Sequence, residues 1–360
     1  MAYTKEEARR LVIEGGKRLL QSGLVVRTWG NISARISEEQ FVITPSGKAY
    51  ETLTPEDIVV VNISDLSYEG EVKPSSERGV HAQAYRLRKD VNFVIHTHQS
   101  NASALSILGK NMEHIGGYME GADGILGSVV PCAQYGRNAS KKIQNNVAIV
   151  IEDYPESKAF FMKNHGALCL GKDCEQAFRV ADTLERISGF RFREICKDAL
   201  EEKEKLGSDE YRSAFLKIFE EAFDPDYEKR KKLYDLPAVE AICYSHAPYT
   251  KLMANQGKIL YPFIDDLAQI GGEKILCLKR QSTYGEIASA LKKNSAVLIE
   301  EVGAVCVGAN ASEAEAVALV LEKAAKASVL AKSVGNVAPL SYLDAHHDRK
   351  TYIKSYSKLI

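Results

Sequence analysis

The sequence predicts a layered α/β or α+β fold, in which helices pack on the faces of a sheet. The 360-residue chain begins with apolar residues at helical spacing. Segments in which apolar residues alternate with a period of two, as in strands, come next, and further amphipathic helical segments are mixed with strand-like segments after them. Turn-forming Pro, Gly, Asp and Ser residues separate these segments. The length of the chain leads us to expect about two domains.

The amino-terminal helix is expected over residues 5–22. Thr4 and Glu7 have capping-box spacing, apolar residues follow at helical intervals, and Gly23 ends the pattern. Farther on, "FVI" and "DIVVVNIS" are typical of short strands, and each is followed by turn residues. The chain therefore begins with a helix and continues into strands.

The stretch "KPSSERGVHAQAYRLRKD" predicts a second helix, with Ser75 or Ser76 as its cap and Glu77 in its first turn. His81 follows Glu77 by one helical turn, and we expect it to brace the helix or the Glu77 carboxylate. "VNFVI" then predicts a strand, and "SNASALSIL" predicts a helix that ends at Gly109.

The next part of the chain continues this alternation. "SVVPC" predicts a strand and "NASKKIQNNVAIVIED" a helix. "AFFMK" and "ALCLG" predict a hairpin around "NHG", where Gly166 is expected to let the backbone bend tightly. Residues 173–198 have the periodicity of a long amphipathic helix.

The second half of the chain contains an internal repeat. Residues 91–110 align without gaps on residues 239–258, and residues 159–177 resemble residues 296–314, while nothing after 239 corresponds to about the first 70 residues. We therefore predict a first domain over 1–200, a charged helical connector over 201–236, and a truncated, degenerate repeat over 237–360 that lacks the site described below. In this alignment His96 corresponds to Tyr244, His98 to His246, His165 to Val302 and Tyr118 to Asp266.

Composition excludes some functional classes. The net charge of -1 gives no general field that would attract nucleic acid or an anionic membrane. No apolar run approaches the ~20 residues that a membrane-spanning helix needs, and "MAYTKEEARR" is charged where a signal peptide is apolar. The seven cysteines form no CxxC pair and are typical of reduced, buried thiols. We expect a cytoplasmic protein.

Two histidines, His96 and His98, follow an apolar run one residue apart. Side chains at i and i+2 of a strand point the same way, roughly 7 Å apart, so both imidazoles could face one ion. His165 in the "NHG" turn could add a third imidazole and Glu77 a carboxylate, which together describe a catalytic zinc-type site with room for substrate. The alternative is that an HxH pair is simply two histidines at a surface or a strand edge.

Three short loops, "WGNIS", "TPSG" and "PSSE", offer backbone N–H groups and small hydroxyl or amide side chains. Ser75 and Ser76 stand at a helix amino terminus, where the helix dipole favours an anion such as a phosphate group. Each loop taken alone is equally typical of an ordinary turn or helix cap.

The ordered set "GNISAR", "ITPSGKAYETLTPEDIVVV", "PSSERGVHAQAY", "VIHTHQSNASALS", "GGYMEGA" and "NHGALCLGKDCEQAFRVADTLE" closely resembles the class II aldolase/adducin family over about residues 3–195. The best-known enzymatic pattern in that family is that of fuculose-1-phosphate aldolase. The resemblance implies an α/β/α layered fold with a central mixed or antiparallel sheet. It also implies a homo-oligomer, usually a C4 tetramer, with sites near the subunit interfaces.

The resemblance also assigns roles to residues. It implies that His96, His98 and His165 bind zinc or another divalent cation, and that Glu77 is an acid/base that also lies against the metal. Tyr118 would donate a proton to the aldehyde oxygen from a neighbouring subunit. The phosphate of the substrate would be bound by Asn31, Thr44, Gly47, Ser75 and Ser76.

The function that these roles imply is zinc-dependent cleavage of a ketose 1-phosphate to dihydroxyacetone phosphate and an aldehyde. Such a cleavage leaves negative charge on the ketone fragment, which a divalent cation stabilises. A sugar-phosphate 4-epimerase or an oxo-acid phosphate decarboxylase would use the same metal site. A non-catalytic, adducin-like scaffold is a further alternative, which the full set of candidate ligands disfavours.

Overall fold

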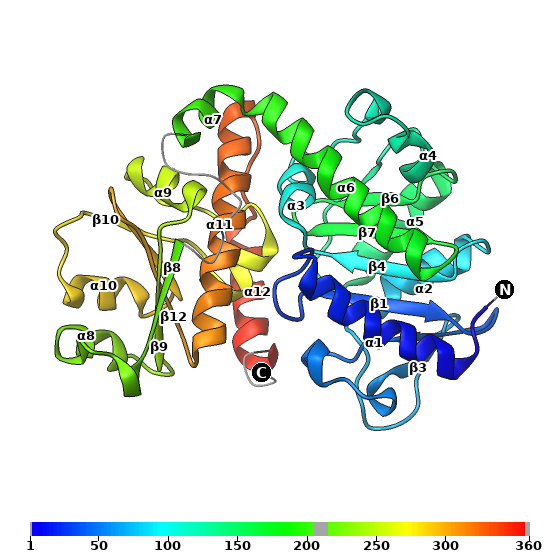
Figure 1. The fold of residues 1–360 in the computed structure, drawn as a ribbon, viewed down its shortest axis with the longest axis horizontal. Coiled ribbons are helices and arrows are strands. Elements are labelled where there is room, and N and C mark those ends of the chain that lie inside the picture. Colours follow the sequence, from blue (N-terminus) through cyan, green and yellow to red (C-terminus); the bar gives the residue numbers. More distant parts are fainter. Residues whose placement is uncertain (1, 205–214, 357–360) are drawn as a thin grey trace. The chain divides into compact units, whose positions relative to one another are not determined.

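The computed structural model describes residues 2–204 and 215–356, which fall into two compact units (Figure 1). The first unit extends to Phe192 and the second begins at Arg193. Residues 205–214 of the predicted connector and residues 357–360 of the predicted repeat lie outside the described residues.

A seven-stranded mixed sheet forms the centre of the first unit, with the strand order β3-β2-β1-β4-β7-β6-β5. Neighbouring strands are antiparallel except β5 and β6, which are parallel. The strands are β1 (Gly30–Arg35), β2 (Gln40–Ile43), β3 (Val59–Asn62), β4 (Phe93–Thr97), β5 (Cys132–Ala133), β6 (Ala159–Met162) and β7 (Gly166–Gly171).

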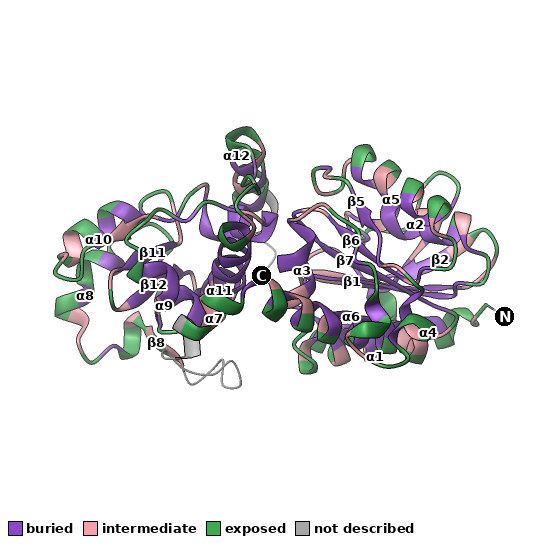
Figure 2. Cartoon of the chain, turned by 90° about the horizontal axis from the view of Figure 1, so that it is seen from above, coloured by how far each residue is buried: buried purple, intermediate pink, exposed green. Residues whose placement is uncertain are grey.

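Helices cover both faces of this sheet (Figure 2). On one face, apolar residues of α2 (Arg78–Leu87) and α5 (Lys141–Asp153) share a core with the strands. On the other face lie α1 (Lys5–Gln21) and α6 (Cys174–Ile195). Because both faces are covered, β4 is buried at every position, which explains its continuous apolar run. The predicted α/β/α layering with a mixed sheet is confirmed.

Shorter helices join these elements, and none of the described helices is long and apolar enough to cross a bilayer. In the first unit they are η1 (Tyr50–Thr52), η2 (Pro55–Asp57), α3 (Ser100–Ser106), η3 (Ile115–Gly117) and α4 (Ala122–Leu126).

The start of α2 differs from the prediction. The helix begins at Arg78, and its N-cap is Glu77 rather than Ser75 or Ser76. The hydroxyl of Ser75 accepts a hydrogen bond from the Glu77 backbone N–H at 3.2 Å, and so stabilises the turn before the helix. Glu77 therefore stands just outside the first turn, where its side chain is turned into the protein and buried.

The hairpin of β6 and β7 is present as predicted, but Gly166 has a different role there. Asn164 is the residue of the turn with a positive φ, 61°. A Cβ atom on Gly166 would lie 2.3 Å from the Thr97 carbonyl oxygen. Glycine is therefore required at 166 because the hairpin approaches the end of β4 closely, and this approach brings His165 to the same place as His96 and His98.

The second unit has a five-stranded sheet with the order β10-β11-β12-β9-β8. Its strands are β8 (Leu216–Glu220), β9 (Ala241–Ser245), β10 (Cys277–Leu278), β11 (Ala296–Ile299) and β12 (Gly303–Gly308). Its helices are α7 (Lys197–Glu204), η5 (Glu221–Phe223), α8 (Tyr227–Tyr234), α9 (Pro248–Asn255), η6 (Leu267–Gly271), α10 (Tyr284–Leu291), α11 (Ala311–Val334), α12 (Tyr342–Thr351) and η7 (Tyr352–Tyr356).

The two sheets have the same core arrangement. The order β5-β6-β7-β4-β1 corresponds to β10-β11-β12-β9-β8, and in each sheet the first pair alone is parallel. The contacts are repeated as well. The Glu185 carboxylate accepts hydrogen bonds from the backbone of Asn101 and Ala102 at the start of α3, and Glu322 does the same for Tyr249 and Thr250 at the start of α9.

The repeat begins earlier than the sequence alignment indicates. β8 pairs with the outer edge of β9 as β1 pairs with β4, and α8 packs against α10 as α2 packs against α5. The prediction of a helical connector is therefore wrong for residues 216–220, which form an edge strand. The segment was difficult to recognise because β8 and α8 are only a few residues apart, whereas β2 and β3 lie between β1 and α2.

The side chains at corresponding places in α2 and α8 differ in chemistry. Glu77, His81 and Tyr85 of the first unit correspond to Asp226, Arg230 and Tyr234 of the second, each set at the N-cap and then four and eight residues later. Arg230 forms an ion pair with the fully buried Asp224 carboxylate, which also accepts a hydrogen bond from Tyr234 at 2.7 Å. A permanent guanidinium charge thus occupies this part of the second unit.

Replacing Arg230 by Met is expected to destabilise the second unit by about 3–5 kcal/mol, because Asp224 would keep a buried charge without its partner. Chemical denaturation measures this change. The double variant Arg230→Met with Asp224→Asn removes both charges and should recover part of the loss. A single variant as stable as the wild type would show that this ion pair contributes little.

Candidate metal centre

Four buried side chains of the first unit, Glu77, His96, His98 and His165, converge on one point. The Nε2 atom of His96 lies 2.8 Å from Nε2 of His98 and 3.1 Å from Nε2 of His165. Oε1 of Glu77 lies 2.9 Å from Nε2 of His165, and Oε2 of Glu77 lies 3.1 Å from Nε2 of His96. The structure therefore brings together all four residues that the sequence singled out as candidate ligands.

Three separate elements supply these groups. His96 lies within β4 and points to the sheet face that α2 covers, His98 follows the end of the same strand, and His165 comes from the β6–β7 turn. Glu77 is the N-cap of α2, which places its carboxylate above the end of β4. The rings of His96 and His165 are stacked, with centroids 4.9 Å apart, while the ring of His98 stands at 70° to that of His165.

The donor set fits a divalent cation. Nδ1 of His96 donates a hydrogen bond to the Ala167 carbonyl oxygen at 2.9 Å, so the neutral ring presents a lone pair at Nε2. Three Nε2 atoms facing one another repel unless a positive charge lies between them. Nitrogen ligands about 2.1 Å from a tetrahedral zinc ion are about 3.4 Å apart, so these residues need to open only slightly to hold one.

The charge state of Glu77 also suits a cation site. Burial alone would raise the pKa of this carboxyl group, but its electrostatic and hydrogen-bond contacts with His96 and His165 outweigh burial and hold the pKa well below its usual range. Glu77 is therefore ionised at neutral pH. A carboxylate is the form that binds a metal ion or accepts a proton.

Asn31 and His81 support Glu77 from behind. Nδ2 of Asn31 donates a hydrogen bond to Glu77 at 2.9 Å, and Oδ1 of Asn31 contacts Nε2 of His81. Nδ1 of His81 lies 2.6 Å from the Ser33 hydroxyl, which in turn lies 2.8 Å from the Tyr85 hydroxyl. His81 therefore braces the Glu77 carboxylate as expected, but it does so indirectly, through Asn31. Ser33 and Tyr85 were not recognised from sequence, although Glu77, His81 and Tyr85 share one face of α2.

Burial and the nearby His96 lower the pKa of His81 to about 3, so this imidazole is neutral at physiological pH. The unfolded chain binds a proton here near pH 6.5, whereas the folded chain does not. Stability should therefore fall as the pH drops below 6.5, by up to about 1.4 kcal/mol per pH unit from this residue. Denaturation of the wild type and of His81→Gln between pH 4 and 7 measures this contribution, and equal slopes would contradict it.

Two of the three loops predicted to bind phosphate, "TPSG" and "PSSE", lie side by side. The Thr44 carbonyl oxygen accepts a hydrogen bond from the Ser75 backbone N–H at 3.0 Å, and the two loops are joined again between Ser46 and Lys73 at 2.9 Å. Gly47 has a φ of 73°, a left-handed conformation that favours glycine. Thr44, Gly47, Ser75 and Ser76 thus belong to adjoining loops that lead directly to Glu77.

Asn31 is placed differently from the other predicted phosphate ligands. Its side chain is buried in β1 and one of its two Nδ2 hydrogens is directed at Glu77. One amide hydrogen remains for a substrate oxygen. The main contact that the structure gives to Asn31 is therefore with the acid/base candidate, and its binding of phosphate stays a prediction.

Tyr118 lines a pocket of about 240 Å³ together with His114 and Arg191. Its hydroxyl accepts a hydrogen bond from the Arg191 guanidinium at 3.0 Å. The role of Tyr118 as a proton donor to a neighbouring subunit's site stays a prediction.

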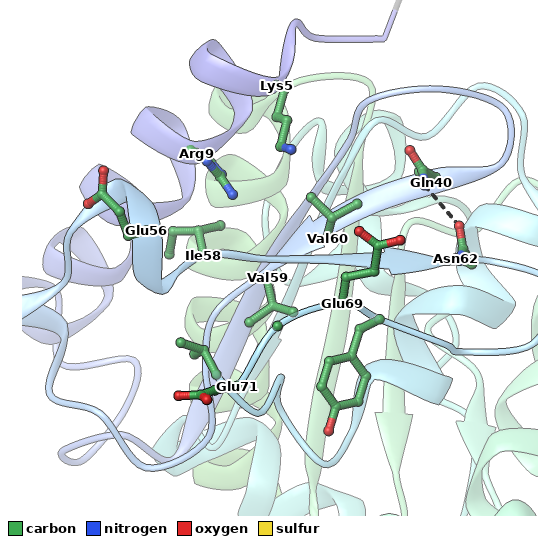
Figure 3. Close-up of a pocket in the computed structure, with 13 residues that line it drawn as sticks. Lys5, Arg9, Gln40, Glu56, Ile58, Val59, Val60, Asn62, Glu69 and Glu71 are labelled. Carbon is green, nitrogen blue, oxygen red and sulfur yellow. Dashed lines mark hydrogen bonds between the residues drawn. The ribbon is translucent and has the colours of Figure 1, made fainter.

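A pocket of about 290 Å³ lies over β2 and β3, away from the candidate metal centre in the strand order (Figure 3). Lys5 and Arg9 of α1 border it, and Gln40 donates a hydrogen bond to Asn62 across its base at 2.9 Å. None of the predicted site residues lines this pocket, so it adds nothing to the proposed chemistry.

Comparison with known proteins gives a consistent result. The family model described as "Class II Aldolase and Adducin N-terminal domain" matches residues 10–190 and again residues 231–329. The chain is 33% identical to 5-deoxy-D-ribulose 1-phosphate aldolase of Bacillus thuringiensis serovar kurstaki over 181 residues, which are 50% of this chain and 82% of that protein. It is 32% identical to L-fuculose phosphate aldolase of Escherichia coli over 50% of this chain and 80% of that protein.

Among solved structures, an L-fuculose 1-phosphate aldolase is 26% identical with a TM-score of 0.49, and the match covers 55% of this chain and 89% of that one. The named relatives support the prediction of a lyase. The two separate matches of the family model also agree with the internal repeat. Because these matches span most of its length, the chain belongs to the class II aldolase and adducin N-terminal domain family.

Proposed function

We propose that this protein is a divalent-metal-dependent aldolase that cleaves a ketose 1-phosphate to dihydroxyacetone phosphate and an aldehyde. The convergence of Glu77, His96, His98 and His165 carries this proposal. The relatives named above act, by their names, on 5-deoxyribulose 1-phosphate and fuculose phosphate, which supports a phosphorylated ketose as the substrate class.

The three histidines would hold zinc or another divalent cation through their Nε2 atoms, with Glu77 lying against it. When bound, the cation would supply Lewis-acid stabilisation of the negative charge that develops on the substrate oxygens. The side chains of all four residues are buried, which keeps competing water away and strengthens electrostatic interactions there.

Glu77 is the proposed proton carrier. Oε2 accepts a hydrogen bond from Asn31 and lies 3.1 Å from Nε2 of His96, while Oε1 lies 2.9 Å from Nε2 of His165, so both oxygens face the candidate ligands. As a carboxylate, this group can accept a proton from substrate and later deliver it to the carbon atom that cleavage leaves behind. The proton is thus transferred by Glu77, whose ionised form the surrounding residues already stabilise.

Thr44, Gly47, Ser75 and Ser76 would bind the phosphate at the far end of the substrate. Holding this group fixes the orientation of the reacting carbons relative to Glu77 and lowers the entropic cost of the reaction. Tyr118 of a neighbouring subunit would hydrogen-bond the aldehyde oxygen as it forms, and in the reverse, condensing direction it would donate the proton that this oxygen then needs. This last role requires a homo-oligomer.

The proposal is tested by incubating the purified protein with a panel of phosphorylated ketoses and pentuloses. Release of dihydroxyacetone phosphate that stops on chelation and returns with added zinc is the expected result. An epimerised product without triose phosphate would instead indicate a 4-epimerase, and carbon dioxide from an oxo-acid phosphate a decarboxylase. A protein that binds no divalent ion and shows no turnover would indicate a scaffold.

A further inference from the structure

A chain of polar side chains runs from Glu77 into the core between β1 and α2. Asn31, Ser33, His81 and Tyr85 form it, and all of them are buried, with Ser33, His81 and Tyr85 completely so. Each contacts the next at hydrogen-bond distance. Buried polar groups are costly unless every donor meets an acceptor, so such a chain has a definite arrangement of hydrogen atoms.

The carboxylate determines the direction of the first links. Nδ2 of Asn31 donates a hydrogen bond to a Glu77 oxygen at 2.9 Å, and that oxygen accepts it. The Oδ1 atom of Asn31 then faces His81 and only accepts, so Nε2 of His81 must carry the hydrogen. If the amide of Asn31 were flipped, its Oδ1 atom would face a Glu77 carboxylate oxygen, and two acceptors would oppose each other.

The remaining links follow from the hydrogen that Nε2 of His81 carries. With its hydrogen on Nε2, its Nδ1 atom accepts a hydrogen bond from the Ser33 hydroxyl. Ser33 has only one hydrogen, so its oxygen accepts the next hydrogen bond from Tyr85. Every donor in the chain Tyr85, Ser33, His81, Asn31 therefore points toward Glu77.

We propose that Asn31 and His81 are positioning residues that hold the Glu77 carboxylate in one rotation, with Oε1 beside His165 and Oε2 beside His96. The inference rests on the proposed function for its catalytic consequence. The two hydrogen bonds of His81 go to Asn31 and Ser33, so it acts on the site by fixing the amide of Asn31, which donates to Oε2 of Glu77. Groups behind a metal ligand of this kind commonly change metal affinity or activity 10–100-fold.

The second unit supports this interpretation. The place of His81 is taken by Arg230 and that of Glu77 by Asp226. β8 can be aligned with β1 through the strand that each pairs with, β9 and β4. In this alignment Lys217 and Phe219 of β8 occupy the positions of Asn31 and Ser33 of β1. The unit in which only His246 remains of the three histidines has therefore also lost the counterparts of Asn31, Ser33 and His81 and keeps only the tyrosine, as expected if the chain serves the site rather than the fold.

The test compares the wild type with His81→Leu, which removes both hydrogen bonds, and His81→Gln, which keeps a donor near Nε2 and an acceptor. Nitrogen NMR of histidine-labelled protein should show His81 as the neutral Nε2–H form. Zinc affinity, measured by competition with a chelator, should fall 10–100-fold in His81→Leu and by less than about threefold in His81→Gln.

Turnover should follow the same order. In His81→Leu we expect kcat to fall 10–100-fold with KM nearly unchanged, because the substrate phosphate loops are not altered. A purely structural role for His81 predicts equal damage in both variants. An Nδ1–H form of His81, or a His81→Leu variant that is folded by thermal denaturation and has unchanged zinc affinity and kcat, would overturn the proposal.

The outcomes separate this inference from the proposed function. If the wild type cleaves no phosphorylated ketose, the aldolase proposal fails. The Nε2–H form of His81 and the zinc affinities of the two variants still decide whether the chain positions Glu77.

Discussion

Replacement of Glu77 by Gln is expected to lower turnover by a factor of about 10²–10⁴, which is the usual contribution of a general acid or base. Glutamine has nearly the same shape and can still accept the hydrogen bond from Asn31 and lie against a cation. It cannot accept and return a proton. Metal content should therefore stay close to that of the wild type while kcat falls.

The measurement is kcat for triose phosphate release together with bound metal by elemental analysis. Asp226→Asn is a matched control, because Asp226 is the N-cap of α8 as Glu77 is the N-cap of α2. This control should keep full turnover. A Glu77→Gln variant with full metal content and unchanged kcat would remove Glu77 from the reaction.

Replacement of His98 by Gln should weaken zinc binding by at least about 100-fold and abolish turnover at low metal concentration, because one of three imidazole ligands is lost. His98 is buried and its Nε2 atom faces Nε2 of His96. Zinc affinity measured with a competing chelator and activity measured at increasing zinc concentration test this expectation.

The chain contains its own control for this experiment. His246 follows β9 as His98 follows β4, but it is exposed and its Nδ1 atom donates a hydrogen bond to the Val302 carbonyl oxygen at 2.8 Å. His246→Gln should leave zinc affinity and turnover unchanged. Equal losses in the two variants would mean that the second unit takes part in metal binding.

Sequence by itself determined the elements and the ligand types. The capping pair Thr4 and Glu7 marked the first helix, whose N-cap hydrogen bond is present at 3.2 Å. The repeat at an offset of 148 residues placed β9 at 241–245, the exact counterpart of β4 at 93–97. These features depend on residues close in the chain, so periodicity and spacing reveal them. The motif resemblance then identified the family.

Tertiary structure alone decided which distant residues meet. No local pattern shows that the "NHG" turn reaches His96, because this depends on the register of β4 with β7 and on the close approach that Gly166 allows. The same holds for Asn31, whose amide faces Glu77 only because β1 pairs with β4 beside α2. It also holds for β8, whose charged, half-exposed sequence resembles a connector until β9 provides its hydrogen-bonding partner. Strand pairing acts over long separations in sequence, and its outcome is determined by the packing of the whole unit.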